Sequence, residues 1–202
     1  LQYHAKRFFQ NVAVVTVPAE GDAGNIEVWA LNDEGVAVDA RVAVRTMDFQ
    51  GACLGTLELP AVLPPRSATR LAVYALDRFG TEKERVGRFL SLTLDAVVEG
   101  KPVTFANEWL FNAYKACPLA DADVRWSARN DNGVWTVSLT TDRPAFFTWV
   151  NATGIPGEFS DNSFTLYPDR PVTLTFTPKK PDARFADFKA ALSVFHLRRT
   201  YR

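Results

Sequence analysis

The chain has 202 residues, of which 47% are hydrophobic, 12% aromatic and 23% charged. This composition supplies enough apolar surface for a folded globular core and excludes intrinsic disorder. The 23 Lys and Arg residues balance the 23 Asp and Glu residues, so the chain lacks the basic excess that is typical of nucleic-acid binding. No run approaches the roughly 20 apolar residues that span a bilayer, so we expect no membrane-spanning helix.

The N-terminal segment is the best helix candidate. Leu1, Ala5, Phe8 and Phe9 share one helical face, but ten residues alone form only a marginal helix. This apolar stripe needs a partner, which we expect to precede Leu1. Because Leu1 is not an initiator methionine, we also expect the chain to be a mature or excised piece of a longer protein.

Alternation of apolar and polar residues dominates the next hundred positions. A period of two predicts antiparallel strands with one buried face, separated by turn residues. The predicted strands of this part lie at residues 26–30, 42–46, 69–76, 90–94 and 103–106. The turns between them include residues 32–35, 48–51 and 99–101.

The alternation breaks after Trp109 and resumes at Val124. Residues 112–123 contain Pro118 and small residues without periodicity, which indicates a linker. Further on, residues 131–133 (Asp-Asn-Gly) lie between two alternating runs, and Asn-Gly is a strong hairpin signal because both of its residues adopt positive φ. The predicted strands of this part lie at residues 124–129, 135–140, 146–150, 164–167, 172–176 and 192–197.

The predicted fold class is all-β. Two sets of six or seven strands indicate two tandem immunoglobulin-like β-sandwiches joined by a short linker, with a short helical segment at the N-terminus. The predicted boundaries are residues 1–11 for the helical tail, 12–111 for the first sandwich, 112–123 for the linker and 124–202 for the second sandwich. Neither sandwich has two cysteines, so we expect no inter-sheet disulfide of the antibody type.

The cysteines and histidines do not form a metal-binding pattern. Cys53 and Cys117 lie far apart, and His4 and His196 lie at opposite ends of the chain, so the ligand spacing of a zinc site is absent. We predict two free and buried thiols, since a free cysteine behaves as a small hydrophobic residue. His196 lies between Phe195 and Leu197 in a predicted strand, where a structural role is expected.

Catalytic patterns are absent as well. The chain has no nucleophile motif beside a histidine and no glycine-rich phosphate loop. A glycosidase needs two carboxylates in one cleft, but the carboxylate pairs here, Asp121 with Asp123 and Glu82 with Glu84, lie in predicted turns. We therefore expect no catalytic residue, no metal and no cofactor.

The aromatic residues have two possible roles, as part of a packed core or as a sugar-binding platform. Trp135 is in register with Val137 and Leu139, which predicts a core position. Phe146, Phe147 and Trp149 fall on both faces of one predicted strand, so at least one of them is expected at an interface. The six residues at issue are Trp109, Trp126, Trp135, Trp149, Phe146 and Phe147.

Four strings, in order along the chain, resemble the end of family 2 glycoside hydrolases of the β-mannosidase type. LQYHAKRFFQ at residues 1–10 is similar to the segment that ends their catalytic barrel, and residues 107–119 are similar to the linker before their last sandwich. GEFSDNSFTLYP at residues 157–168 resembles a stretch of that sandwich, and LSVFHLRRTY at residues 192–201 resembles its closing strand. The resemblance covers essentially the whole chain and implies that residues 1–11 are the tail of an upstream (β/α)₈ barrel.

The catalytic glutamates of that family lie in the barrel, and no position here matches their motifs. Residues 10–11 (Gln-Asn) stand where the family often has a proline, and His196, Arg198 and Arg199 fill positions that are often Ser or acidic. Within the Phe-Ser-Asp-Asn string, Phe159 is spaced to enter the core. Ser160, Asp161 and Asn162 can hydrogen-bond the backbone, so we predict a structural turn motif rather than a substrate site.

The leading functional hypothesis is the non-catalytic C-terminal accessory region of a β-mannosidase-like glycosidase. The resemblance implies that the parent protein hydrolyses terminal non-reducing β-D-mannose residues and that this region braces its barrel. The expected partners are that barrel and a mannose-containing oligosaccharide, with no nucleic acid and no membrane, in a bacterial cytoplasm or periplasm. Two alternatives stay open: a carbohydrate-binding module for mannan, favoured by exposed coplanar tryptophans, and an adhesion-type double sandwich, favoured by an open edge strand.

Overall fold

The computed structural model describes residues 2–201, except for the side chain of His4. The chain divides into two compact units, the first unit with residues 2–118 and the second unit with residues 119–201. Strands dominate both units. In the part of the chain that the structure describes, no helix is long and apolar enough to cross a membrane.

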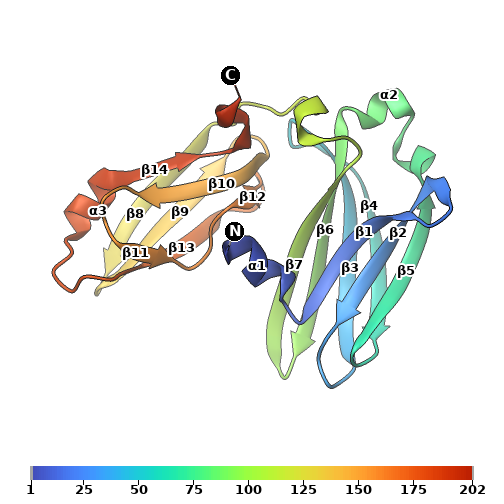
Figure 1. Ribbon diagram of the computed structural model, residues 1–202, viewed down its shortest axis with the longest axis horizontal. Coiled ribbons are helices and arrows are strands. Elements are labelled where there is room, and N and C mark those ends of the chain that lie inside the picture. The colour runs from blue at the N-terminus through green and yellow to red at the C-terminus, as the bar shows by residue number, and fades with distance from the viewer. Residues whose placement is uncertain (1, 202) are drawn as a thin grey trace. The chain divides into compact units, whose positions relative to one another are not determined.

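The first unit is a sandwich of a three-stranded and a four-stranded antiparallel sheet (Figure 1). The smaller sheet has the order β1 (Val12–Ala19), β2 (Asp22–Asn32) and β5 (Ser67–Ala75). The larger sheet has the order β4 (Cys53–Leu63), β3 (Val38–Asp48), β6 (Arg88–Val98) and β7 (Lys101–Leu110).

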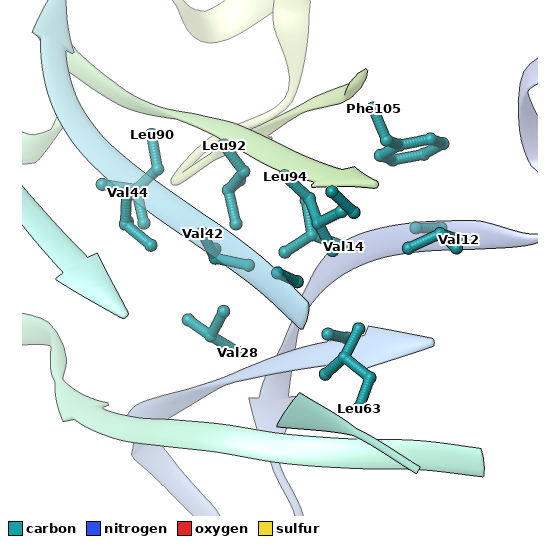
Figure 2. Packing of buried hydrophobic residues seen from close by; sticks show 14 of the residues in the cluster. Val12, Val14, Val28, Val42, Val44, Leu63, Leu90, Leu92, Leu94 and Phe105 are labelled. Carbon is teal, nitrogen blue, oxygen red and sulfur yellow. The ribbon is translucent and has the colours of Figure 1, made fainter. Parts of the chain in front are cut away.

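The core of the first unit consists of the side chains that alternate toward the space between the two sheets. Val14 and Val28 of the smaller sheet meet Val42, Leu92 and Leu94 of the larger one (Figure 2). All five are at most 1% exposed. At about 1.5–3 kcal/mol for each fully buried aliphatic side chain, this alternation supplies the main driving force for the sandwich.

Short helical turns connect and flank these strands. They are α1 (Gln2–Phe8), the 3₁₀ turns η1 (Leu76–Phe79) and η2 (Tyr114–Ala116), and α2 (Glu82–Arg85). Thr81 caps α2: its Oγ1 accepts the Glu84 N–H, and the Glu84 carboxylate accepts the Thr81 N–H at 2.8 Å. This reciprocal capping satisfies the free amides of the first turn, and the hydrogen bonds from Thr81 lower the pKa of Glu84.

The second unit is also a sandwich of two antiparallel sheets. One has the order β11 (Gly157–Phe159), β13 (Val172–Pro178), β9 (Val134–Thr141) and β8 (Val124–Asp131). The other has the order β12 (Phe164–Leu166), β10 (Ala145–Ala152) and β14 (Leu192–Phe195). Helix α3 (Phe185–Ala191) precedes β14, and the 3₁₀ turn η3 (Leu197–Thr200) follows it.

Aromatic rings fill the core of the second unit. Trp135 of β9 lies parallel to Phe176 of β13, with ring centroids 6.0 Å apart. Phe188 of α3 is fully buried, and its ring centroid lies 4.5 Å from that of Phe176 and 5.1 Å from that of Trp135. Helix α3 therefore forms because Phe188 enters this cluster, since seven residues do not make a stable helix alone.

The prediction of two immunoglobulin-like sandwiches is confirmed. The Asn-Gly hairpin is also as predicted: Asn132 and Gly133 join β8 to β9 with φ of 53° and 89°. The expected helix at the N-terminus is present as α1, in which Phe8 is 73% exposed; Phe9, just after it, is 84% exposed. Leu1, the first residue of the predicted stripe, lies outside the described residues.

Three expectations from the sequence were wrong. Cys53 is exposed, because the first four residues of β4 are all exposed to solvent. Cys117 is buried as predicted, and burial raises the pKa of its thiol. Helices α2 and α3 were not expected, because each is too short to show a helical period. The last predicted strand ends at Phe195, so His196 lies in the connection to η3 rather than in a strand.

Candidate functional site

Asn162 of the Phe-Ser-Asp-Asn string links a buried loop to the central strand β10. Its Oδ1 accepts the Val150 N–H at 2.8 Å, and its Nδ2 donates to the Val150 carbonyl at 2.7 Å. The Asn162 side chain thus pairs with Val150 as a neighbouring strand would, although no backbone reaches that position. Only 1% of Asn162 is exposed, so the amide is held inside the sandwich.

The other residues of the string connect to β13 and to the local backbone. The Ser160 N–H donates to the Thr175 carbonyl at 2.8 Å, and the Thr175 N–H donates to Ser160 Oγ at 3.0 Å. The Asp161 carboxylate accepts the N–H of Asn162 at 2.7 Å. The buried ring of Phe159 lies 4.8 Å from that of Phe176. The structure therefore brings Phe159 and Asn162 into the core of the second unit, whereas Ser160 bonds β13 at the exposed Thr175.

The candidate aromatic residues do not share one surface. Trp135 and Phe146 are buried, and Phe147 and Trp149 are half-buried on β10. Phe147 has φ of 50° where the pairing of β10 with β12 shifts register, so a β-bulge sets its direction. Among the tryptophans of the second unit, Trp126 on β8 is the most exposed, at 36%.

A further aromatic residue, Trp29, marks the outer face of the β1–β2–β5 sheet. Its indole N–H donates to Glu27 Oε2 at 2.8 Å, and Arg70 Nη1 donates to Glu27 Oε1 at 2.9 Å. The Arg70 guanidinium lies 6.0 Å from the centre of the Trp29 ring. Val15 pairs with Trp29, and Val17 and Val73 flank Glu27 in register. We call these six residues the Trp29 face.

The Trp29 face is less polar than the outer face of a solvated sheet. Strand β1 carries valine on both of its faces. In a sheet with one face in water, the residues that point outward are usually polar. Val17 and Val73 are 37% and 47% exposed. Trp and Arg, which are enriched at the centres of protein interfaces, lie here in an arrangement fixed by Glu27. The face therefore has the chemistry of a docking surface.

His196 is held beside the start of β8 and is only 1% exposed. Its Nε2 lies 3.2 Å from the Ala122 carbonyl, which can only accept, so Nε2 carries the proton. Asp121 Oδ1 lies 3.6 Å from the same nitrogen and 3.3 Å from Arg199 Nε. Burial, with the positive charge of Arg199, lowers the pKa of His196. The imidazole thus joins the end of the second unit to its beginning.

Three carboxylates of the predicted turn pairs make separate contacts. Asp121 binds Arg199, Asp123 binds Arg125, and Glu84 binds Thr81 and Arg88. Within residues 2–201, apart from the side chain of His4, no group of three His, Cys, Asp or Glu side chains could hold a metal ion.

Two family models match the chain, one in each unit. Residues 24–115 match the mannosidase Ig/CBM-like domain, and residues 119–200 match the mannosidase Ig-fold domain. The chain is a tandem of mannosidase-type immunoglobulin-like domains. The resemblance to the sandwich region of family 2 β-mannosidases, which the sequence strings indicate, is thereby confirmed.

Individual relatives agree with the two families. The β-mannosidase of Mus musculus is 31% identical over 83 residues, which cover 41% of this chain and 9% of the mouse protein. The crystal structure of the β-D-mannosidase from Dictyoglomus thermophilum has the same fold, with a TM-score of 0.76 at 19% identity, over 96% of this chain and 22% of that protein. An exo-chitosanase of Amycolatopsis orientalis matches 96% of this chain and 26% of its own, with a TM-score of 0.50 at 16% identity. The chain spans only a minor part of each of these larger proteins.

The sequence pattern did not single out the Trp29 face. Glu27 and Trp29 are recognisable as the outward residues of an alternating strand, but Arg70 is 43 positions from Glu27. A local period indicates which way a side chain points and gives no information about which distant strand lies beside it. The sequence signal that could have indicated this face is an outward tryptophan with a carboxylate two positions before it on the same face of the strand.

Proposed function

We propose that these two domains are the non-catalytic accessory region of a β-mannosidase-like glycosidase and that they brace its catalytic barrel. The parent protein would hydrolyse terminal non-reducing β-D-mannose residues. The two family matches and the mannosidase relatives support this assignment. The Phe159–Asn162 segment then serves as an internal support of the second unit rather than as a substrate site.

The observation that carries the bracing role is the Trp29 face. An apolar sheet face with a fixed Trp–Glu–Arg arrangement is suited to bind another folded domain. The two mannosidases contain more than three quarters of their length outside the matched region, so such a domain is available in proteins of this type. Docking there would bury Val17 and Val73 together with the Trp29 ring.

The test compares two pairs of exposed valines in the parent protein and in the 202-residue chain. V17K/V73K places positive charge on the Trp29 face beside Glu27, and V62K/V97K places it on the outer side of the other sheet, where Val62 and Val97 are 65% and 60% exposed. We expect both pairs to leave the melting temperature of the 202-residue chain within about 2 °C. In the parent protein, only V17K/V73K should lower the melting temperature of the catalytic domain, by about 4 °C or more.

The outcome decides between two surfaces. If V62K/V97K alone lowers the melting temperature of the parent protein, the Trp29 face does not dock the barrel. If neither pair does, the bracing role is wrong. Separately, the purified 202-residue chain should not hydrolyse an aryl β-mannoside above the buffer rate, because no position in it matches the catalytic glutamate motifs of the glycosidases that it resembles. Turnover that disappears on mutation of a single Asp or Glu would contradict the non-catalytic assignment.

A further inference from the structure

The hairpin that joins β8 to β9 carries a pair of residues with a reactivity of its own. Asn132 and Gly133 form its two-residue loop, and both have positive φ. They are the only Asn-Gly pair among the nine asparagines of the sequence. Both residues are exposed, and a Cβ added to Gly133 would meet nothing within 4 Å. The loop therefore has room for a change in its covalent structure.

An Asn-Gly pair can form a ring with its own backbone. The Gly133 nitrogen loses its proton to water and attacks Cγ of the Asn132 side chain. A bond forms between this nitrogen and Cγ, while the bond from Cγ to Nδ2 breaks, and Nδ2 takes up a proton and leaves as ammonia. Water then opens the succinimide ring to aspartate or isoaspartate. Glycine favours the attack, because it lacks the Cβ that would hinder its nitrogen.

The Asn132 side chain is available for this reaction. It is exposed and makes no hydrogen bond or ion pair within residues 2–201. Asn162 differs, because it is buried and its amide is bonded to Val150 on both sides. Asn151 differs as well, because its Nδ2 donates to Thr153 at 2.9 Å. The amide of Asn132 is therefore free to turn toward the Gly133 nitrogen.

Asn130 holds the group that has to attack. Its Oδ1 accepts the Gly133 N–H at 3.0 Å. The reaction needs the same nitrogen without its proton and turned toward Cγ of Asn132, so this hydrogen bond has to break first. The loss of one hydrogen bond corresponds to a change of about two- to tenfold in an equilibrium constant. The side chain of Asn130 thus opposes the reaction that the loop otherwise permits.

We propose that Asn132 is a site of spontaneous deamidation and that Asn130 slows the reaction by holding the Gly133 N–H. Deamidation places a new carboxylate beside Asp131 in a chain whose charges otherwise balance. The isoaspartate product also adds a methylene group to the backbone of the loop that sets the register of β8 against β9. The inference does not depend on the bracing role, because this hairpin and the Trp29 face lie in different units.

The experiment follows all nine asparagines of the 202-residue chain by peptide mapping and mass spectrometry, during incubation in mildly alkaline buffer. We expect Asn132 to convert faster than the other eight. N130A removes the acceptor and should accelerate the conversion about fivefold. N130D keeps an acceptor, and its charge opposes the loss of the Gly133 proton, so Asn132 should convert no faster than in the native chain. S127A, exposed on the same strand, is the matched control and should leave the rate unchanged.

Incubation in concentrated guanidinium chloride separates the hydrogen bond from the local sequence. The hairpin is absent from the unfolded chain, so the native chain, N130A and S127A should convert at one common rate, which exceeds that of the folded native chain. Equal rates for the folded native chain and N130A overturn the proposal, as does fast conversion in folded N130D. A difference that persists in the denaturant overturns the role of Asn130. Conversion of Asn132 no faster than that of the other asparagines overturns the site.

Discussion

At the scale of single residues, Asn162 and His196 are polar side chains buried in the second unit. Asn162→Ala removes both bonds to Val150 and leaves that buried N–H and carbonyl without partners. Each such group costs about 1–3 kcal/mol, so we expect a loss of about 2–4 kcal/mol in the free energy of unfolding of the second unit, measured by chemical denaturation. Asn151→Ala is the matched control, because Asn151 is exposed and its side chain bonds only Thr153 among residues 2–201. An equal loss in both variants would contradict the structural role of the Phe159–Asn162 segment.

The lowered pKa of His196 predicts that the stability of the second unit depends on pH. Its pKa in the folded chain lies below the ordinary value of 6.5, because burial and Arg199 disfavour the imidazolium. The unfolded chain therefore binds a proton at higher pH than the folded chain does, and stability falls as the pH drops from about 6.5 through the folded pKa. We expect unfolding experiments at pH 7.5 and 5.5 to show a smaller loss for His196→Gln, which keeps a donor for Ala122 without titrating. An identical loss in both proteins would exclude His196 as the source.

At the scale of elements, Gly157 leaves room for the Phe176 ring of β13 beside the backbone of β11. A Cβ at this position would collide with the ring of Phe176, which lies over the backbone of β11. We expect Gly157→Ala to cost about 1–3 kcal/mol of stability through overpacking. Gly55→Ala on the exposed strand β4, where a Cβ meets nothing within 4 Å, should change stability by about 0.5 kcal/mol or less. Thermal unfolding of the two variants distinguishes them, and equal effects would contradict the assigned contact.

Elements with a strong local period were predictable, and elements that depend on distant contacts were not. Strands β3 and β6 follow from the alternation of apolar and polar residues in the sequence, although both faces of β6 are buried from Phe89 to Leu94. Helix α3 was not predicted, because it depends on the contacts of Phe188 with Trp135 and Phe176, which are distant in the sequence. The same holds for the candidate sites: the pairing of Asn162 with Val150 spans 12 positions, and the Glu27–Arg70 pair spans 43.

At the scale of the whole molecule, the segment between the two units lacks strand pairing. Residues 112–123 contain only the short turn η2 in the structure, and Lys115 within it is exposed. We predicted this segment as a linker, and cleavage concentrates where few contacts hold the backbone. Lys115 is also the single Lys or Arg between residues 112 and 123, so trypsin has one target there.

Brief digestion with trypsin should therefore cut first after Lys115. The expected products are residues 1–115 and 116–202, each with a complete sandwich and its own core. Lys115→Gln should abolish this first cut without changing the thermal stability of either unit, because the Lys115 side chain makes no hydrogen bond or ion pair within the described residues. Mass spectrometry identifies the products, and circular dichroism of the separated pieces tests whether both stay folded. A first cut within β8, at Arg125 or Arg129, would contradict the linker, since it would mean that a paired strand opens more readily than residues 112–123.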